Sequence, residues 1–330
     1  LVGRLLVGAA AARFAKGACM TADVITPSTS IDIGICTFRR AELEETLSSL
    51  FAMTVPTGGR VRLIVADNDH RPTARALVEA LSRMSPYPIA YVHCPQANIS
   101  LARNGCLDAC EADYLAFIDD DERATTTWLA ALYERIAATG ADAVLGPVEA
   151  IYDGSAPDWM RCGDFHSTRP VWVAGDIRTG YTCNVLLDMR SPHVAGRRFD
   201  LALGQSGGED TQFFAAMTGA GGRIAYAPAA LVTEAVPAGR ASLAWLIKRR
   251  FRSGQTHGRI VAGQGSTAGR LRRAGLALAK IGFCSLACAG LVVLPVRRNR
   301  YLLRACLHAG AVSGILGVRE IRQYGLVEAS

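Results

Sequence analysis

Four consecutive acidic residues are the strongest candidates for chemistry in this sequence. They occupy positions 119–122 (DDDE), directly after the apolar run 114–118 (YLAFI). Carboxylates crowded at the end of a buried strand repel one another, and a shared divalent cation relieves that repulsion. Mg²⁺ and Mn²⁺ accept one or two carboxylates together with phosphate oxygens of a substrate. The alternative is a solvated acidic loop that caps the next helix through Asp121 or Thr125.

A second acidic pair, Glu209 and Asp210, directly follows two glycines, Gly207 and Gly208. The glycines allow the backbone to turn sharply and to approach a ligand closely. In a functional role, one carboxylate would be a general base that accepts a proton from an attacking hydroxyl. In a purely structural role, the pair would interact with the positive end of the helix predicted over 211–217.

One arginine belongs with these acidic candidates. Arg103 lies near the start of a helix predicted over 99–111. The start of such a helix faces the ligand edge of a parallel sheet, where an arginine can bind a diphosphate or a carboxylate. The structural alternative is a surface arginine that pairs with Asp108 or Glu111.

Alternating apolar strands and amphipathic helices would position these side chains. This alternation predicts an α/β fold, a mostly parallel sheet with helices on both faces. Such sheets bind ligands beyond the carboxyl ends of their strands, where the polar clusters lie in this sequence. The predicted strands are 30–38, 61–66, 89–93, 114–118 and 143–145, and the predicted helices are 41–53, 73–84, 99–111 and 128–139. The looser, Gly- and Pro-containing residues 150–240 are expected to shape a cleft for an acceptor.

Charge is distributed unevenly along the chain. Residues 1–240 contain 21 basic and 27 acidic residues, whereas residues 241–330 contain 15 Lys or Arg residues and two acidic residues, Glu320 and Glu328. A basic segment can bind nucleic acid, but the apolar runs within this one favour an anionic lipid surface. We therefore expect a membrane partner and no nucleic acid.

Two apolar segments, 274–296 and 301–318, form most of this basic tail. If both crossed a bilayer, the arginines between them at 297–300 would lie outside, against the positive-inside tendency. A re-entrant or interfacial helical hairpin keeps the arginines at the cytoplasmic headgroups. The alternative is a pair of helices packed on the catalytic domain or on a second subunit.

Composition and these segments divide the chain into four parts. Residues 1–29 are an N-terminal extension, in which Met20 could be the true initiator; a short signal-like segment is the alternative. Residues 30–254 are the catalytic domain, 255–269 a Gly/Ser/Thr-rich linker, and 270–330 the membrane-associating tail.

Five motifs in order resemble family 2 glycosyltransferases of the GT-A fold. The resemblance covers roughly residues 30–254, and it implies an inverting, Mn²⁺- or Mg²⁺-dependent transfer from a nucleotide sugar. The motifs are Cys36-Thr37-Phe38-Arg39-Arg40, Val65-Ala66-Asp67-Asn68, Ala102-Arg103-Asn104-x-Gly, Phe117-Ile118-Asp119-Asp120-Asp121 and Gly208-Glu209-Asp210.

The resemblance also implies a role for individual residues. The nucleoside is expected at the ends of the first two strands, near Thr37, Phe38, Arg39, Asp67 and Asn68, with Arg103 also on the nucleotide sugar. Asp119 and Asp120 would contact the nucleotide sugar, and Asp119 and Asp121 would hold the metal. Asp210 would be the base, with Glu209 beside the acceptor. Arg249 and Arg250 would contact the donor diphosphate.

Shorter strings, including Glu234-Ala235-Val236-Pro237, resemble bacterial exopolysaccharide glucosyltransferases of the succinoglycan type. That narrower resemblance implies UDP-glucose as the UDP-sugar donor and a polyprenyl-diphosphate-linked oligosaccharide as the acceptor, at the cytoplasmic face of the bacterial inner membrane. Three alternatives stay open. They are another nucleotide sugar for a different glycan, a nucleotidyltransferase, and a non-catalytic, membrane-associated sugar-binding protein on the same fold.

Overall fold

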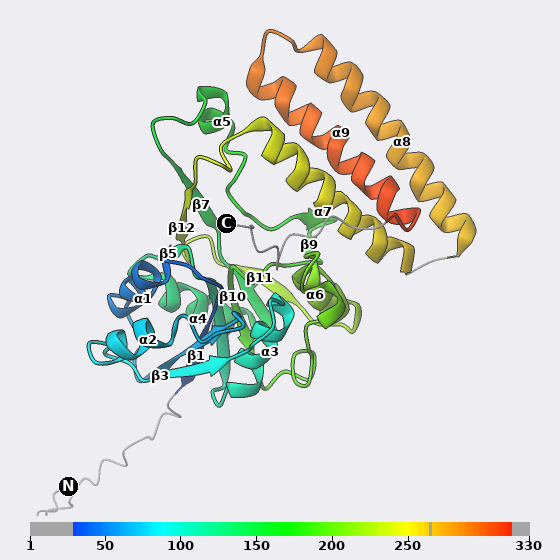
Figure 1. Ribbon diagram of the computed structural model, residues 1–330. Helices are drawn as coiled ribbons and strands as arrows, with labels where there is room; N and C mark the ends of the chain where they lie inside the picture. Colours follow the sequence, from blue (N-terminus) through cyan, green and yellow to red (C-terminus); the bar gives the residue numbers. More distant parts are fainter. Residues whose placement is uncertain (1–28, 264–265, 319–330) are drawn as a thin grey trace, which may run out of the picture.

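The computed structural model describes residues 29–263 and 266–318. The predicted N-terminal extension, except for residue 29, lies outside the described residues, and so do Met20 and residues 319–330 of the predicted tail. The described chain consists of an α/β body followed by three long helices (Figure 1).

A seven-stranded sheet forms the centre of the body. Its order is β11-β6-β10-β4-β1-β2-β3, and all neighbours are parallel except β10, which is antiparallel to both β4 and β6. The strands are β1 Ser30–Thr37, β2 Arg60–Asp67, β3 Ile89–His93, β4 Tyr114–Asp119, β6 Ala143–Leu145, β10 Asn184–Asp188 and β11 Ile224–Tyr226. The predicted α/β fold with a mostly parallel sheet is confirmed.

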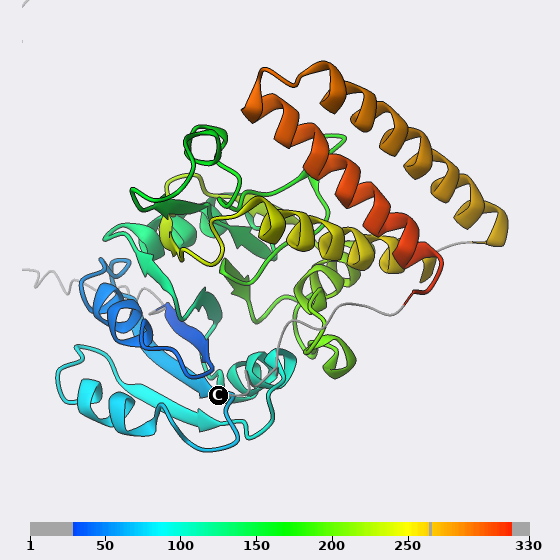
Figure 2. The same ribbon diagram turned by 45° about the horizontal axis from the view of Figure 1, so that its top comes forward.

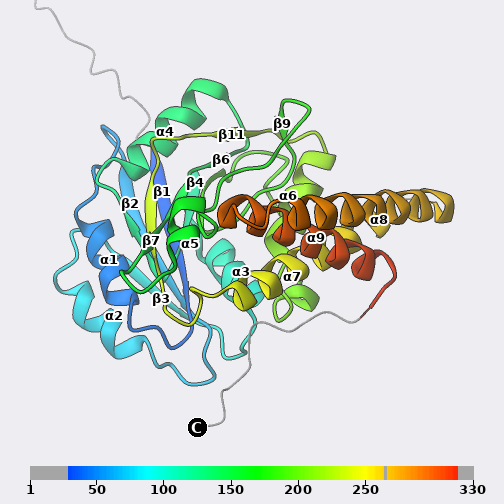
Figure 3. The ribbon, with the colours of Figure 1, turned by 90° about the horizontal axis from the view of Figure 1, so that it is seen from above.

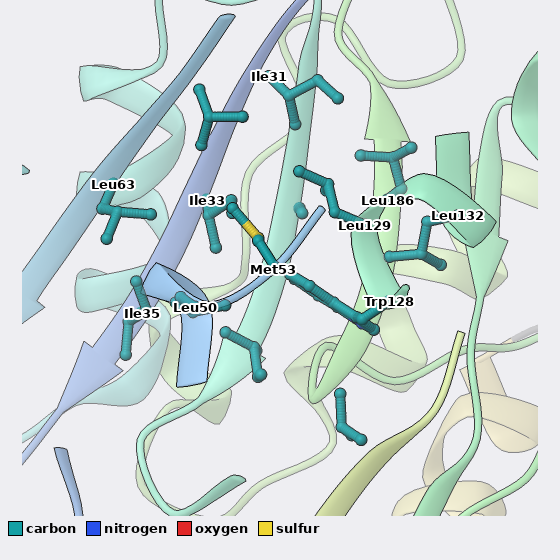
Figure 4. Packing of buried hydrophobic residues seen from close by; sticks show 14 of the residues in the cluster. Ile31, Ile33, Ile35, Leu50, Met53, Leu63, Trp128, Leu129, Leu132 and Leu186 are labelled. Atoms are coloured by element: carbon teal, nitrogen blue, oxygen red, sulfur yellow. The ribbon is translucent and has the colours of Figure 1, made fainter. Parts of the chain in front are cut away.

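Helices cover both faces of this sheet because its strands are apolar on both sides. Alternate residues of β4 face opposite ways: Ala116 and Ile118 pack in one core and Leu115 and Phe117 in the other. The first core also contains Ile33 of β1 and the buried ring of Trp128 (Figure 4). Its helices are α1 Leu43–Phe51, α2 Arg75–Ser82 and α4 Trp128–Thr139; the second core contains α3 Ile99–Ala109 and α6 Glu209–Gly219.

Smaller elements lie beyond the central sheet. A second sheet has the order β5-β12-β7, with β5 Glu122–Ala124, β12 Val232–Val236 and β7 Val148–Tyr152. Because β5 follows β4 almost directly, this sheet brings β12 beside the acidic run at 119–122. The remaining short elements are α5 Asp158–Gly163, β8 Trp172–Val173, β9 Asp176–Ile177 and the 3₁₀ turn Leu201–Leu203.

The three C-terminal helices form one array, with α9 between α7 and α8 (Figures 1 and 2). They are α7 Leu243–Gly263, α8 Thr267–Gly290 and α9 Pro295–Ile315. The two helices of the predicted hairpin are thus present, and α9 packs along α7. Seen from above, α8 projects away from the α/β body (Figure 3).

The predicted linker at 255–269 is wrong for residues 255–263, which continue α7 as a helix. Glycine disfavours helix in isolation, but here it permits close packing of two helix backbones. A Cβ on Gly254 or Gly258 would meet backbone atoms of α9 at 2.0 and 2.2 Å, and a Cβ on Gly310 or Gly314 would meet α7 at 1.9 and 2.1 Å. Tertiary contact therefore overrides the local composition.

One helix in the described part of the chain, α8, is long and apolar enough to cross a membrane by length and composition. Only 11% of its most apolar window is buried within the protein. The second apolar segment, α9, is instead partly covered by α7 and α8.

Candidate active site

The ends of three parallel strands bring the sequence-predicted polar residues together. Thr37 of β1 is in register with Asp67 of β2, and Cys36 is in register with Asp119 of β4. The Thr37 hydroxyl is buried near Asp120, and no described residue makes a hydrogen bond of normal geometry to it. An unpaired buried hydroxyl at this edge is suited to a ligand's polar group.

Asp67 holds the loop that follows β2. It is fully buried, and it accepts hydrogen bonds from the backbone amides of Asp69 and Ala74 at 3.1 and 2.9 Å and from the Tyr91 hydroxyl at 2.6 Å. The side chain of Asn68 accepts a hydrogen bond from the backbone amide of Asn98 at 3.1 Å. Both side chains therefore shape the predicted nucleoside pocket by fixing its loops.

Arg39 lies at the mouth of the same region with a left-handed backbone, φ 54°. Its guanidinium makes two hydrogen bonds to Asp69, at 2.8 and 2.9 Å, and lies 5.2 Å from the centre of the Phe38 ring. Hydrogen bonds from Arg39 are the main reason why the pKa of Asp69 is lowered. Phe38 and Arg39 thus form a half-exposed surface beside the loop that Asp67 fixes.

The acidic residues at and directly after the end of β4 form, with Glu234 of β12, a group that we call the acidic cluster. Its members are Asp119, Asp120, Asp121, Glu122 and Glu234. Burial, with repulsion from Asp121, raises the pKa of Asp120 to about 7, and burial raises that of Asp119 to about 7 although Arg103 opposes the shift. Negative charge is therefore costly here until a cation arrives.

Two arginines partly balance this charge. Arg40 lies 3.9 Å from Asp120 and 3.5 Å from Asp121. Arg240 lies 3.7 Å from Asp121 and donates a hydrogen bond of 2.7 Å to Glu234. Sequence reasoning missed Glu234 as a site residue and Arg240 altogether. The pairing of Glu234 with Glu122 across β12 and β5 places Glu234 here.

The acidic cluster fits a hard divalent cation through its oxygen atoms. One carboxylate oxygen each of Asp119 and Glu122 and the Cys183 sulfur lie within 4.8 Å of one another. Burial raises the pKa of Cys183 well above its usual value, so its sulfur stays protonated and is a poor ligand. Glu122 already accepts a hydrogen bond from the backbone amide of Asp119. Carboxylates at the open side, Asp119 and Asp121, offer the oxygen ligands that Mg²⁺ and Mn²⁺ bind.

Arg103 is buried between the acidic cluster and helix α6. It forms an ion pair with Glu209 and lies 3.9 Å from Asp119. Burial lowers the pKa of Arg103, but Glu209 and Asp119 more than offset this and hold it above its usual value. The surface pairing of Arg103 with Asp108 or Glu111 is therefore wrong, because the side chain points inward to Glu209.

Glu209 differs from the expectation that it lies beside the acceptor. It is 3% exposed and faces Arg103, although its second oxygen has no hydrogen-bond partner among the described residues. Asp210, the next residue, is less buried and accepts hydrogen bonds from the amide and hydroxyl of Thr211. The two carboxylates therefore have different surroundings, and Asp210 is the more exposed of the two.

Positive φ angles at Gly207 (85°) and Gly208 (94°) produce the turn before α6. A Cβ on Gly208 would lie 2.2 Å from the Thr256 side chain of α7. The turn that presents Asp210 is thus packed directly against the long C-terminal helix.

The two predicted diphosphate arginines of α7 have different surroundings. Arg249 lies 5.3 Å from the centre of the Trp245 ring, and its charge partly opposes the burial that raises the pKa of Glu234. Arg250 donates to the backbone carbonyl of Phe165 at 3.5 Å, and burial lowers its pKa. The structure thus brings Arg249 to the acidic cluster, and it directs Arg250 to the segment after α5.

Sequence comparison finds two matches. Residues 32–201 match the family described as Glycosyl transferase family 2. The chain is 58% identical over 300 residues to the succinoglycan biosynthesis protein ExoM of Rhizobium meliloti (strain 1021), covering 91% of this chain and 97% of that protein.

Structure comparison finds the same fold in proteins of low sequence identity. A mannosyltransferase from Pyrobaculum calidifontis, PcManGT, solved with GDP-Man and Mn²⁺, has a TM-score of 0.58 at 17% identity and covers 87% of each chain. GalNAc-T7, solved with UDP, GalNAc and Mn²⁺, has a TM-score of 0.50 at 14% identity and covers 68% of this chain and 51% of its own. The predicted GT-A fold is confirmed.

Proposed function

The chain belongs to glycosyl transferase family 2, and from this premise we propose that it transfers glucose from UDP-glucose to a polyprenyl-diphosphate-linked oligosaccharide during the synthesis of a succinoglycan-type polysaccharide. The observation that carries the proposal is the 58% identity to ExoM over nearly the full length of both chains. That the chain is a glycosyltransferase follows from the family; donor and acceptor are the proposal.

Asp210 is the general base of this proposed reaction. An inverting transfer needs one group that takes the proton of the acceptor hydroxyl while its oxygen attacks the anomeric carbon. Asp210 is half-buried at the start of α6, and its charge adds to the effect of burial, the main reason why the pKa of Asp119 is raised. Glu209 positions it by anchoring the first turn of α6 to Arg103.

The nucleotide binds at the ends of β1 and β2 in this proposal. The Thr37 hydroxyl and the loop fixed by Asp67 and Asn68 line the pocket, and Phe38 with Arg39 covers one side. Asp119 and Asp120 face the donor, and Arg249 approaches its diphosphate. Arg250 supports the neighbouring segment through the Phe165 carbonyl.

Asp119 and Asp121 hold Mn²⁺ or Mg²⁺ in this proposal, and the carboxylate of Glu234 lies beside them. The ion would offset the negative charge that develops on the departing diphosphate. The acidic cluster supports this assignment because its carboxylates outnumber the arginines that contact them.

A membrane-bound acceptor accounts for the exposed side of the C-terminal helices. Large apolar side chains on α8 and the following turn are exposed, among them Phe283, Leu286 and Val293. Exposed arginines, including Arg270 and Arg297, lie near the two ends of the helix. We place α8 at the anionic cytoplasmic face of the bacterial inner membrane, as an interfacial helix.

Transfer assays with labelled sugars test the proposal. Membranes that contain the protein should transfer label from UDP-glucose to the lipid-linked acceptor in the presence of Mn²⁺ or Mg²⁺, and membranes with Asp210→Asn should not. If label were transferred from a different nucleotide sugar and not from UDP-glucose, the assignment of UDP-glucose as the donor would be refuted. If no nucleotide sugar supported transfer to any acceptor, the non-catalytic sugar-binding alternative would be favoured.

A further inference from the structure

Arg240 lies between two carboxylates of the acidic cluster although it is distant from the acidic run in sequence. One guanidinium nitrogen donates to Glu234 at 2.7 Å, and another lies 3.7 Å from Asp121. The contact with Glu234 is a normal hydrogen bond, whereas the contact with Asp121 is long and easily broken. Arg240 therefore occupies the side of the cluster where a divalent cation would meet Asp121.

The backbone of Arg240 is fixed while its side chain is long and half-exposed. The Arg240 carbonyl accepts a hydrogen bond of 3.1 Å from Nε2 of His166, and the His166 ring stacks on Trp245. Burial lowers the pKa of His166 to about 4, so the ring is neutral near pH 7. Because Nε2 must carry the proton, Nδ1 accepts a hydrogen bond from the Tyr152 hydroxyl at 3.0 Å.

We propose that Arg240 is an internal counter-cation that holds Asp121 and Glu234 until a divalent metal displaces it, and that its guanidinium then binds the donor diphosphate. The first half of the proposal, displacement of Arg240 by the metal, depends only on the acidic cluster. The second half, binding of the diphosphate, rests on the proposed function. When the metal binds, Arg240 thus exchanges the carboxylates of Asp121 and Glu234 for the donor diphosphate.

The chemistry of arginine requires such an exchange. Arginine keeps its charge in proteins, so Arg240 cannot escape a nearby metal by losing a proton. A divalent ion bound by Asp121 would repel the guanidinium at a distance of a few ångströms. A diphosphate is a fitting new partner, because a planar guanidinium can donate two parallel hydrogen bonds to phosphate oxygens. The hydrogen bond from His166 fixes the backbone of Arg240 beside the acidic cluster, so the long side chain can change partners without a movement of the backbone.

Mn²⁺ binding to the donor-free protein tests the first half. Free Mn²⁺ is measured by electron paramagnetic resonance in titrations of the wild type, Arg240→Ala, Arg240→Gln and the control Arg198→Ala, which removes an exposed ion pair with Asp108. Loss of the competing charge should tighten Mn²⁺ binding by about tenfold in both Arg240 variants and leave the control unchanged. Unchanged or weaker binding in the folded Arg240 variants would overturn the proposal, because a merely structural arginine would loosen the ligands.

Nucleotide binding at saturating Mn²⁺ tests the second half, with UDP as the probe in calorimetric titrations. Arg240→Ala should weaken UDP binding by about tenfold, a loss of about 1.4 kcal/mol, and Arg240→Lys should restore part of it. Equal UDP affinity in wild type and Arg240→Ala would overturn the exchange. If the wild type bound no UDP but bound GDP or another nucleoside diphosphate, the donor assignment would fail, and the same comparison would be made with that nucleotide.

Discussion

At the residue scale, the site is organised around carboxylates that lie close together and are only partly balanced by arginine. The pKa of both Asp119 and Asp120 is raised to about 7, and Asp69, paired with Arg39 at the nucleotide side, has a lowered pKa. The surroundings therefore shift the pKa values of carboxylates in one region in opposite directions.

The raised pKa of Asp120 predicts how stability depends on pH without metal. A carboxyl group has a pKa near 4 in the unfolded chain, so the folded protein binds this proton more tightly between about pH 4 and 7. The contribution of the Asp120 carboxyl group to the free energy of unfolding is therefore present at low pH and is lost as the pH rises through 7. In chelator, the melting temperature of Asp120→Asn minus that of the wild type should increase from pH 5 to pH 8.

Differential scanning fluorimetry at several pH values measures this difference. Comparing the two proteins removes the effect of histidines with lowered pKa, such as His166, because both proteins share them. Added Mn²⁺ should stabilise the wild type at pH 8 much more than at pH 5. A difference that stays constant or shrinks with rising pH would contradict the raised pKa.

The two acidic residues at the start of α6 are expected to have different roles: Asp210 is the base, and Glu209 is a positioning residue. Asp210→Asn should lower kcat by about 10²–10⁴-fold with little change in nucleotide affinity. Glu209→Gln should instead lower the free energy of unfolding by up to about 3–5 kcal/mol, because it leaves Arg103 without its buried partner. Steady-state kinetics and denaturant unfolding distinguish them. Full activity of Asp210→Asn, with Glu209→Gln inactive but stable, would make Glu209 the base.

The sequence was sufficient to predict which residues meet at the ends of the strands. It was not sufficient to predict ion pairs between residues that are far apart in the chain. Asp67 and Asp119 directly follow apolar runs, so their convergence follows from parallel strands alone. Arg103 and Glu209 are 106 residues apart, and no local pattern indicates that they pair. Arg240 was missed for the same reason, since only the packing of its loop on His166 brings it to Asp121.

At the element scale, α7 connects the catalytic turn to the C-terminal helices. Thr256 of α7 packs on Gly208 of the catalytic turn. Gly254 and Gly258 of the same helix pack on α9. Composition predicted a linker because glycine, serine and threonine are common in flexible segments. The two glycine pairs have a helical spacing of four residues, and that spacing was the signal for close helix packing.

Two glycine substitutions on neighbouring helices should have opposite effects. A Cβ on Gly310 of α9 would lie 1.9 Å from the Phe251 carbonyl oxygen, whereas a Cβ on Gly282 of α8 has no atom within 4 Å. Gly310→Ala should therefore destabilise the protein by about 1–3 kcal/mol. Gly282→Ala should be neutral or stabilise it by up to about 1 kcal/mol, since alanine favours helix.

Thermal unfolding and turnover measure both effects. Because α7 supports the turn before Asp210, Gly310→Ala should also reduce kcat, while Gly282→Ala should not. Equal melting temperatures for the two variants would show that α7 and α9 are not in backbone contact.

At the scale of the whole molecule, a catalytic body carries a layer of three helices whose outer member is exposed and apolar (Figures 1 and 3). From residue 241 to residue 318 the sequence contains no Asp or Glu. The pairing of α9 with α7 means that the two tail helices are not equivalent. Within the described residues of the tail, α8 is the helix with a largely uncovered surface, so any membrane contact is expected there.

Substitution of the exposed face of α8 is the sharpest test of membrane binding. Removal of the whole tail would also uncover the glycine face of α7, so lost activity would have two causes. The triple variant Phe283→Gln, Leu286→Gln, Val293→Gln changes only side chains that are 65%, 76% and 85% exposed. Met84→Gln, at an equally exposed apolar residue of the catalytic body, is the matched control.

Wild type and Met84→Gln should sediment with vesicles made of anionic and zwitterionic phospholipid. The triple variant should stay in solution, because it loses most of the apolar area that could enter the lipid–water interface. High salt should release only a fraction of the wild type, since salt screens the arginines and leaves apolar contacts intact. The triple variant should keep its turnover on a water-soluble acceptor and lose most of it on the lipid-linked acceptor. If it sedimented like the wild type, or if the wild type stayed in solution as a dimer that the substitutions dissociate, α8 would be a packing surface between two copies of the chain.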